Sequence, residues 1–417
     1  MLKFRLVAIA FYALAISAGA SAQTPAPEEL LRRLQMLEEQ VRTLQAELAV
    51  LKASAPAPSA ETPSPVQPPV GTVAASDGST QLPMSTTNVF NPNIGMIGNF
   101  IGTGGESRGG TETLAPQPSL TLQESEVSVQ AIIDPFARAD FFLAIGEEGI
   151  EVEEGFATFP YVPGGLLVKA GKMRATFGRV NAFHNHSLPW IDRPLVMYNL
   201  LGGETDDPDT GIKDAGISVS RLIPAGNLFI EAIGEVYRGD SGTLFQSHGR
   251  RDVSVVGHLR GYGDITEASN LEAGFSYARG KNDLGSTFST DLYGIDLTFR
   301  WRPLSRAIYT SLTARTELMW SRHDDINARQ DAFGTYASLD YQFRRRWTLG
   351  GRYDWSERGR DASVADRGIS SLLTFRPSEF SALRGQYRRI RFDDRGVANE
   401  LLLQLLFTIG AHGAHPF

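Results

Sequence analysis

The sequence His184-Asn185-His186 is the first candidate for metal chemistry, because alternate residues of an extended segment project to the same side. Zinc in a closed site takes four ligands, of which imidazole nitrogens are a common kind. Two histidines supply half of such a set, and spacing does not indicate the rest, for which Asp192 or His248 would be guesses. We therefore expect no bound metal and treat His184 and His186 as weak candidates. Ordinary hydrogen-bonded histidines are the favoured interpretation.

Charged residues at alternate positions of apolar stretches form a second candidate set. If these stretches are strands of a membrane-spanning barrel, a charge on the lipid face would cost a few kcal/mol near the midplane, so the charges should face inward. The expected pore-lining residues are Arg260, Arg300, Arg302, Arg315, Arg352, Arg384, Arg388, Glu231, Glu235, Asp296, Glu317, Asp340 and Asp354. Opposed walls of unlike charge would sort solutes by charge and size. The alternative is that these residues pair and fill the interior, and both interpretations can hold together.

Motifs typical of enzymes do not appear in the sequence. There is no Gly-x-Ser-x-Gly elbow, and no serine or aspartate constellation stands out on neighbouring apolar stretches. We therefore expect no enzymatic activity and no cofactor. The formal net charge is -7, with acidic and basic residues interspersed, which argues against nucleic acid as a partner.

From about residue 88 onward, apolar and polar residues alternate with a period of two in the segments that would position these charged residues. Near the end of the chain, Leu401, Leu403 and Leu405 alternate with Glu400 and Gln404. Such alternation is typical of a strand with one face toward lipid and the other toward water or a lumen. After residue 22, no run approaches the roughly 20 apolar residues of a membrane-spanning helix.

About sixteen alternating segments can be counted, from 92-104 at one end to 397-411 at the other, and they include 287-302, 307-321 and 366-376. Tight turns such as Pro224-Ala225-Gly226 separate some of them, and longer polar loops such as 238-250 separate others. An even count with alternating short and long connections predicts an all-β fold, an antiparallel transmembrane β-barrel of about 16 strands with both ends on one side.

One connection, 171-213, is too long for a simple loop and carries the apolar run Leu188-Pro189-Trp190-Ile191. Long ordered loops are usually functional. We expect this one to fold into the barrel and narrow the pore, and the alternative is a cap on the rim or on a neighbouring subunit. The candidate constriction residues are His184, His186, Asp192, Arg193, Glu204 and Asp206.

The first 87 residues predict three segments ahead of the barrel. Residues 1-22 read as a signal peptide, with Lys3 and Arg5, an apolar run and small residues before the cleavage site. Residues 27-52 have apolar positions four and three apart, which predicts a short coiled coil, although a single helix packed on its own barrel is the alternative. Residues 53-87 are rich in Pro, Ala, Ser and Thr and predict an extended linker.

These segments and the barrel, 88-417, predict a protein of the outer membrane, with the coiled coil in the periplasm. A terminal aromatic residue such as Phe417 is the usual signal by which such barrels are recognised for assembly. The expected partners are membrane lipid, the barrel assembly machinery through the C-terminal strand, further copies in a homotrimer, and peptidoglycan through the N-terminal helix.

Four stretches carry a resemblance to a known group: 90-98 (FNPNIGMIG), 171-181 (GKMRATFGRVN), 186-194 (HSLPWIDRP) and 410-417 (GAHGAHPF). Together they resemble envelope proteins related to the phosphate-selective porin-like barrels, some of which are labelled zinc-regulated outer-membrane receptors. The resemblance implies a 16-stranded barrel, often trimeric, with an inward loop. Phosphate selectivity in that group depends on a ladder of arginine and lysine, whereas this chain mixes both signs, so phosphate binding is not carried over. Zinc regulation would concern expression rather than a site in this chain.

The function that these patterns favour is passive diffusion of small hydrophilic solutes or ions through a channel. Sixteen strands enclose a lumen too wide for side chains alone to fill. The alternative is a plugged structural or ligand-binding barrel without channel activity.

Overall fold

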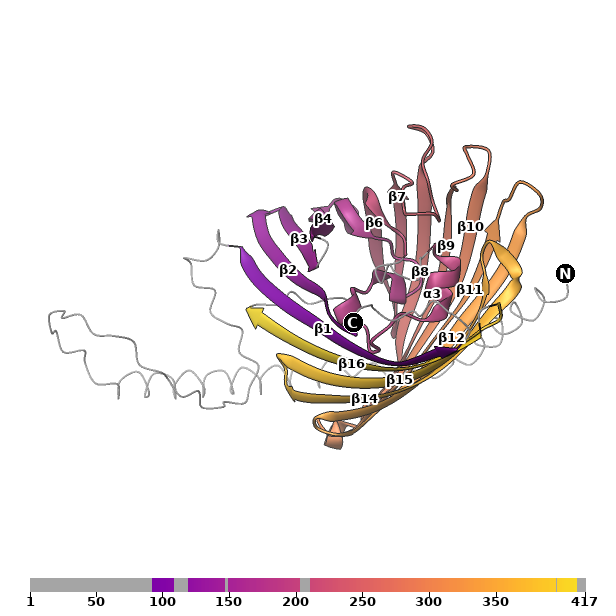
Figure 1. Cartoon of the computed structure of the whole chain (residues 1–417). Coiled ribbons are helices and arrows are strands. Elements are labelled where there is room, and N and C mark those ends of the chain that lie inside the picture. Colours follow the sequence, from indigo (N-terminus) through magenta and orange to yellow (C-terminus); the bar gives the residue numbers. More distant parts are fainter. Residues whose placement is uncertain (1–91, 109–118, 147–148, 203–210, 395, 411–417) are drawn as a thin grey trace, which may run out of the picture. The chain divides into compact units, whose positions relative to one another are not determined.

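The barrel is closed, antiparallel and sixteen-stranded in a computed structural model that describes residues 92-108, 119-146, 149-202, 211-394 and 396-410 (Figure 1). Each strand pairs with its neighbours in the chain, and β16 closes the ring on β1. The strands are β1 (Asn93–Arg108), β2 (Leu120–Asp134), β3 (Ala137–Gly146), β4 (Gly149–Val162), β5 (Leu166–Arg174), β6 (Lys213–Ala225), β7 (Leu228–Tyr237), β8 (Ser254–Thr266), β9 (Ser269–Lys281), β10 (Ser289–Trp301), β11 (Ser311–His323), β12 (Gln330–Arg344), β13 (Trp347–Arg358), β14 (Asp361–Ser378), β15 (Ser381–Phe392) and β16 (Gly396–Gly410). The predicted fold class is confirmed.

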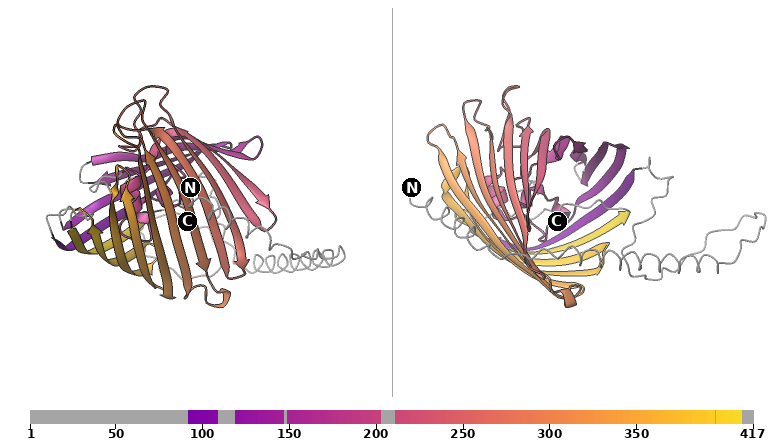
Figure 2. Two further views of the ribbon diagram at one scale, coloured as in Figure 1. Left: turned by 90° about the vertical axis from the view of Figure 1, so that its right-hand side faces the viewer. Right: turned by 180° about the vertical axis from the view of Figure 1, so that it is seen from behind.

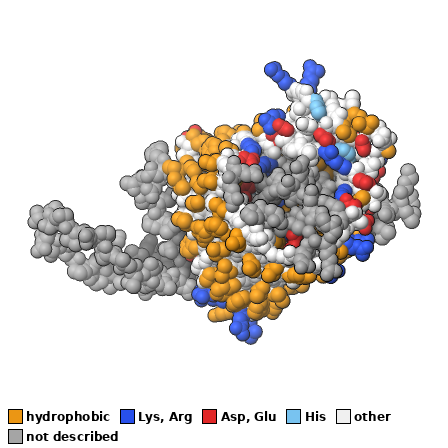
Figure 3. Space-filling model, in the orientation of Figure 1, with side chains coloured by type: hydrophobic (Ala, Val, Ile, Leu, Met, Phe, Trp, Pro, Cys, Tyr) orange, Lys and Arg blue, Asp and Glu red, His pale blue; other side chains and the backbone are white. Residues whose placement is uncertain are grey.

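Alternation along the strands separates an apolar outer face from a polar inner face. On β16, Leu401 and Leu403 are 49% and 56% exposed, whereas Glu400 and Gln404 are buried. Hydrophobic side chains gather over the outer face of the strands that are in view in Figure 3. Because an unpaired charge at a lipid face is costly, this arrangement fixes which set of residues faces the interior.

The longest connections, from β1 to β2, from β5 to β6 and from β7 to β8, all lie at one end of the barrel, and most connections at the other end are short turns (Figure 2). The turn from Asp134 to Ala137 and the turn from Ala225 to Leu228 lie at the short-turn end, where Gly95 also pairs with Gly410. Both termini of the barrel are therefore at the same end as the short turns. The even number of strands requires this.

Three strand boundaries differ from the sequence prediction by four or five residues, and one of them is the end of β1, which we placed at 104 and which lies at Arg108. We predicted a strand over 366-376, but β14 begins at Asp361, because pairing with β13 continues past a register shift between Glu357 and Arg358. We predicted another over 307-321, but β11 begins at Ser311, because the short helix η3 (Leu304–Arg306) and the turn after it occupy the connection. A period of two does not reveal such irregularities at strand ends.

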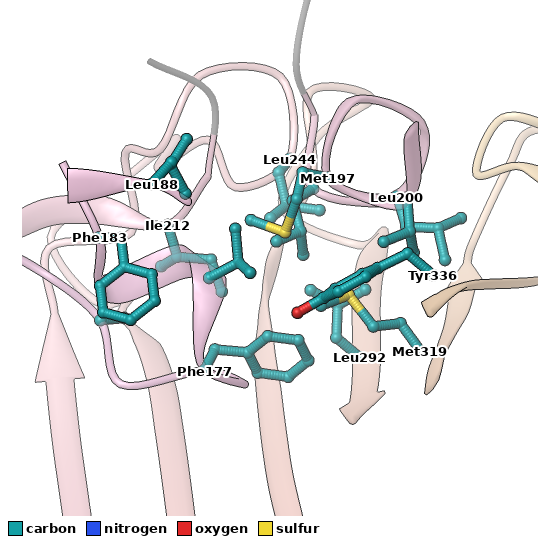
Figure 4. Packing of buried hydrophobic residues seen from close by; sticks show 14 of the residues in the cluster. Phe177, Phe183, Leu188, Met197, Leu200, Ile212, Leu244, Leu292, Met319 and Tyr336 are labelled. Carbon is teal, nitrogen blue, oxygen red and sulfur yellow. The ribbon is translucent and has the colours of Figure 1, made fainter. Parts of the chain in front are cut away.

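Residues 175-212, here called the inner segment, leave the wall at the end of β5 and rejoin it at the start of β6. Their described part contains the short helices η1 (Val180–Ala182), η2 (Asn185–Ser187) and α3 (Leu195–Leu200). Their apolar side chains pack against inward-facing residues of the strands, as Figure 4 shows for Phe177, Met197 and Tyr336. Over the described residues, no helix has the length and apolar character needed to cross a membrane.

Several predictions concern residues outside the described ranges. These are the signal peptide 1-22, the coiled coil 27-52, the linker 53-87, the assembly residue Phe417, and the constriction candidates Glu204 and Asp206.

Candidate functional site: the interior of the barrel

The inner segment crosses the interior between nearly opposite strands. Near its start, Arg179 and Val180 donate backbone hydrogen bonds to Glu317 on β11. Further along, His184 contacts Glu126 on β2 at 2.5 Å. Strand β2 is seven strands from β11 in one direction around the ring and nine in the other. The segment is thus fastened to both sides of the lumen, with the hydrophobic core of Figure 4 between it and the wall.

A tight turn at Gly178 begins this crossing. Its φ of +60° is in the left-handed region that glycine adopts without steric cost. The backbone N–H of Gly178 donates to Ser276 Oγ at 2.8 Å, and the next two N–H groups donate to the Glu317 carboxylate at 3.2 and 3.0 Å. Tyr336 also donates to Glu317, at 2.9 Å. Glu317 therefore accepts the backbone donors that this turn leaves without partners inside the segment.

Asp192 anchors the later part of the inner segment through charge. Its Oδ2 lies 3.0 Å from Arg352 Nη2 and 2.9 Å from Arg388 Nη1, and Gln386 donates to its Oδ1 at 2.6 Å. Burial opposes ionisation of this carboxyl, but the guanidinium groups of Arg352 and Arg388 outweigh it and hold the pKa of Asp192 at about 2. The ion pairs of Asp192 thus join the segment to strands β13 and β15.

Each arginine of this network has a second carboxylate on the wall. Arg352 Nε lies 2.8 Å from Asp354, and Arg388 Nε lies 2.7 Å from Glu400. The ring of Trp190 lies under the Arg352 guanidinium, 4.9 Å from centroid to Cζ. These contacts keep two buried positive charges compensated, which a dry interior requires.

A row of partly exposed ion pairs remains on strands β7 to β12. Arg260 pairs with Glu231, and Arg300 Nη1 lies 3.1 Å from Glu272. Arg315 Nη1 lies 2.6 Å from Asp340. The side chains of Arg260, Arg300 and Arg315 are 35%, 27% and 20% exposed, so they are hydrated from the interior. Solutes inside the barrel would meet both signs of charge along this wall.

Two histidines and four glutamates meet at the opposite wall. His184 Nδ1 lies 2.5 Å from Glu126 and 3.2 Å from Glu153, and its Nε2 lies 2.6 Å from Glu154. His186 Nδ1 lies 3.5 Å from Glu126 and 3.7 Å from Glu124. All six of these residues are less than one-tenth exposed. The inner segment thus meets β2 and β4 through a buried imidazole-carboxylate cluster.

An irregularity in β4 allows two consecutive glutamates to join this cluster. Neighbouring residues of a regular strand point to opposite faces. Pairing of β3 with β4 shifts register here, since Phe142 opposes Glu154 and Leu143 opposes Val152, which leaves Glu153 as the extra residue of a β-bulge. Glu153 and Glu154 are therefore both buried on the inner side.

The carboxylates determine the protonation of His184. Burial disfavours the charged imidazole, but the negative charge of Glu153 and hydrogen bonds with Glu126, Glu153 and Glu154 raise the pKa of His184 well above its usual value. In the absence of another cation, His184 carries a positive charge at neutral pH and bridges β2 and β4.

The structure divides the predicted pore-lining residues by environment. Those partly exposed in ion pairs are Arg260, Arg300, Arg315, Glu231 and Asp340. Those buried against or bonded to the inner segment are Glu235, Glu317, Arg352, Asp354 and Arg388. Asp296 and Arg384 are also buried, and Arg384 donates to Gln404 at 3.1 Å.

Three other candidates have distinct positions. Arg302 lies just beyond the end of β10, in the connection to β11, where it is exposed and donates to the Ala307 carbonyl. It is therefore off the strand on which we placed it, because the ladder ends at Trp301. Arg193 is buried within the inner segment and donates to the Val180 and Phe183 carbonyls. His248, a guess for a further metal ligand, is exposed and contacts the Asn282 carbonyl.

Sequence reasoning missed the carboxylates that surround the histidines. Glu124 and Glu126 are two residues apart on β2, the spacing that also singled out His184 and His186. That shared spacing was available as a signal for a second inward-facing pair. Glu153 and Glu154 gave no such signal, because the bulge that turns both of them inward is invisible in the sequence.

Sequence comparisons with known proteins find one relative and no matching family. No protein-family model matches the chain. An uncharacterized protein of Aquifex aeolicus (strain VF5) is 29% identical in an alignment 363 residues long, which covers 76% of this chain and 74% of that protein.

Solved structures with the same fold are outer-membrane proteins of much lower sequence identity. OprB of Pseudomonas putida, in its high-pH structure, is 11% identical, with 78% of this chain and 95% of that chain covered and a TM-score of 0.54. An anion-selective porin from Comamonas acidovorans is 12% identical, with 76% and 98% covered and a TM-score of 0.52. In-vitro folded OmpT of Vibrio cholerae, in a trimer form, is 10% identical, with 76% and 99% covered and a TM-score of 0.50. The chain therefore has the fold of the outer-membrane porins.

Proposed function

We propose that this protein is an outer-membrane channel for passive diffusion of small hydrophilic solutes or ions, narrowed by the inner segment. The observation that carries this proposal is a closed barrel of sixteen strands with an apolar outer face and a charged, partly hydrated inner wall. Side chains alone do not fill a lumen of this size. The porin fold of the chain supports the same conclusion.

The partly exposed ion pairs of β7 to β12 are the proposed selectivity wall of the channel. Arg260 and Glu231, and Arg315 and Asp340, present fixed charges of both signs to the interior. Together with the inner segment on the facing side, they would act on solutes by a transverse field and by size. We carry over no solute from the porins of similar fold.

A barrel closed by the inner segment is the second candidate. The segment bonds to strands on nearly opposite sides of the ring, through Glu126 on β2 and Glu317 on β11. Its core residues Phe177, Val196 and Met197 are fully buried. A segment held at both sides and packed with apolar side chains could block the lumen and leave a structural or ligand-binding barrel.

Location and assembly belong to the same proposal. We place the barrel in the outer membrane with its short-turn end, which carries both barrel termini, toward the periplasm. A homotrimer is supported by the trimer form of the structurally similar OmpT. Membership of the group related to phosphate-selective porin-like barrels, assembly through the C-terminal strand and contact of the N-terminal helix with peptidoglycan remain predictions from the sequence.

Single-channel conductance of the refolded full-length protein in a planar bilayer tests the proposal. We expect stepwise currents, in groups of three for a trimer, and a reversal potential in a salt gradient that gives the sign of the selectivity. A barrel that is shown by circular dichroism to be folded, and that inserts without conducting, would overturn the channel and favour the closed barrel.

A further inference from the structure

The imidazole-carboxylate cluster between the inner segment and β2 is a second site, separate from the ion-pair wall of the channel. Glu126 Oε2, a nitrogen of His184 and a nitrogen of His186 all lie within 4.8 Å of one another. They come from segments about 60 residues apart in the chain, so the fold alone brings them together. We propose that Glu126, His184 and His186, with Glu124 as fourth ligand, bind one divalent transition-metal ion that clamps the inner segment to β2.

Two of the distances between ligand atoms are close to those of a tetrahedral site, and a third is shorter. With metal-ligand bonds of about 2.0 to 2.1 Å, the ligand atoms of a tetrahedron are about 3.3 Å apart. His186 Nδ1 lies 3.5 Å from Glu126 Oε2 and 3.7 Å from Glu124 Oε1. His184 Nδ1 lies 2.5 Å from Glu126 Oε2, a hydrogen-bond distance that must open by about 0.8 Å when the ion replaces the proton.

The surroundings of His184 prepare one of its nitrogens for a metal. Its Nε2 lies 2.6 Å from Glu154 Oε2, so a proton on Nε2 is held by a carboxylate. The other nitrogen, Nδ1, is the one that faces Glu126. A carboxylate that fixes the tautomer of a ligating histidine is a recurring feature of metal sites. Phe142 packs against the His184 ring at 5.1 Å between centroids and helps to keep the site dry.

One carboxylate oxygen of the cluster has no hydrogen-bond donor within the described part of the chain. Among the described residues, Glu124 Oε1 is buried and accepts no hydrogen bond. Glu124 Oε1 is the oxygen that points to His186. A buried carboxylate oxygen without a donor is costly, and a cation at this point would remove the cost.

The balance between carboxylates and guanidinium groups around the cluster also favours a bound cation. Near the carboxylates of Glu124, Glu126, Glu153 and Glu154 lie two guanidinium groups: Arg174 pairs with Glu153 at 2.9 Å, and Arg193 interacts electrostatically with Glu153 and Glu124. Among the described residues, the carboxylates of the cluster outnumber these guanidinium groups, and a divalent cation would compensate the excess negative charge. Two nitrogen and two carboxylate ligands in a tetrahedral arrangement are typical of zinc, and therefore Zn²⁺ is the probe of choice.

The test measures metal content and coordination of the wild-type barrel, refolded in detergent with Zn²⁺ and dialysed against a weak chelator. We expect about one zinc per chain by mass spectrometry of the element, and an X-ray absorption spectrum with two imidazoles and oxygen ligands in the first shell. Less than one-tenth of an equivalent, or a spectrum with oxygen ligands alone, would overturn the proposal. Neither readout depends on whether the barrel conducts, and neither needs a variant to fold.

Variants then assign the ligands. His186→Gln and Glu126→Gln should each weaken zinc binding by more than 100-fold, whereas Glu154→Gln, which acts through His184, should weaken it by about 10- to 100-fold. The exposed His248→Gln is the matched control and should bind zinc as the wild type does. Unchanged zinc affinity of a folded His186→Gln barrel would show that the ion sits elsewhere and would refute the assignment.

Discussion

Replacement of Asp192 with alanine would remove the ion pairs that join the inner segment to the barrel wall. In the wild type, Asp192 Oδ2 lies 3.0 Å from Arg352 and 2.9 Å from Arg388. After the change, Arg352 keeps Asp354 and Arg388 keeps Glu400. The barrel wall should therefore fold as before, and the loss should fall on the docking of the segment.

The size of the loss follows from the ionisation of Asp192. Its pKa is about 2, against an ordinary 3.8 for a carboxyl, and each such unit corresponds to about 1.4 kcal/mol. The arginines thus favour the docked carboxylate by about 2 to 3 kcal/mol. A loss of that size raises the population of displaced segment about 30- to 150-fold.

Limited proteolysis measures the fraction of molecules in which the inner segment is displaced. The peptide bond after Arg179 lies in the inner segment, where the arginine is buried in the docked state and paired with Glu272. When the segment redocks faster than trypsin cuts, the cleavage rate follows the displaced population. We expect cleavage after Arg179 to be about 30- to 150-fold faster in the Asp192→Ala barrel, together with noisier single-channel currents.

The control is Asp331→Ala, because Asp331 is 58% exposed and pairs only weakly with Arg322 and Arg329, at 3.8 and 3.2 Å. It should leave cleavage after Arg179 unchanged. An Asp192→Ala barrel that folds normally and is cut at the wild-type rate would refute the idea that this ion-pair network holds the segment in place.

Three further outcomes are expected. Since the folded pKa of Asp192 is below the ordinary value, the stabilisation by its charge is present above about pH 4 and is lost as the pH falls through about 2. The free energies of unfolding of wild type and Asp192→Ala, measured by tryptophan fluorescence, should therefore converge over that range. A constant difference between them would contradict this role of the Asp192 charge. Glu317→Ala removes the acceptor of the turn at Gly178 and of the Tyr336 hydroxyl, and should lower the free energy of unfolding in urea by about 3 kcal/mol; a change below about 1 kcal/mol would count against its capping role. Arg260→Gln removes a positive charge from the partly exposed wall and should raise the cation-to-anion permeability ratio about twofold, as read from the reversal potential; an unchanged ratio would place the selectivity elsewhere.

The number and direction of the strands could be predicted from the sequence. Alternation of Leu401, Leu403 and Leu405 with Glu400 and Gln404 is local information, because strand geometry places every second side chain on one face. The high cost of a charge in lipid then decides which face is outside. The same local argument found the apolar run at Leu188 in a connection too long for a simple loop.

The partners of the inward-facing residues could not be predicted in this way. Arg352 and Arg388 were expected to face solutes, yet both are buried against Asp192, about 160 and 196 positions away in the chain. Periodicity says that a residue faces inward and says nothing about what occupies the inside. Only the path of the inner segment decides whether such a charge meets water or a buried carboxylate.

The site at His184 and His186 shows the same division. The sequence singled out the two histidines and showed that their connection is too apolar to lie in water, but its premise of an extended segment was wrong, because Asn185–Ser187 form the short helix η2. Only the tertiary structure decided that Glu124 and Glu126 of β2 face them, and that a bulge in β4 brings in both Glu153 and Glu154. The physical reason is that side-chain alternation is a property of each strand, whereas ligand sets and ion pairs depend on register and on long-range packing across the barrel.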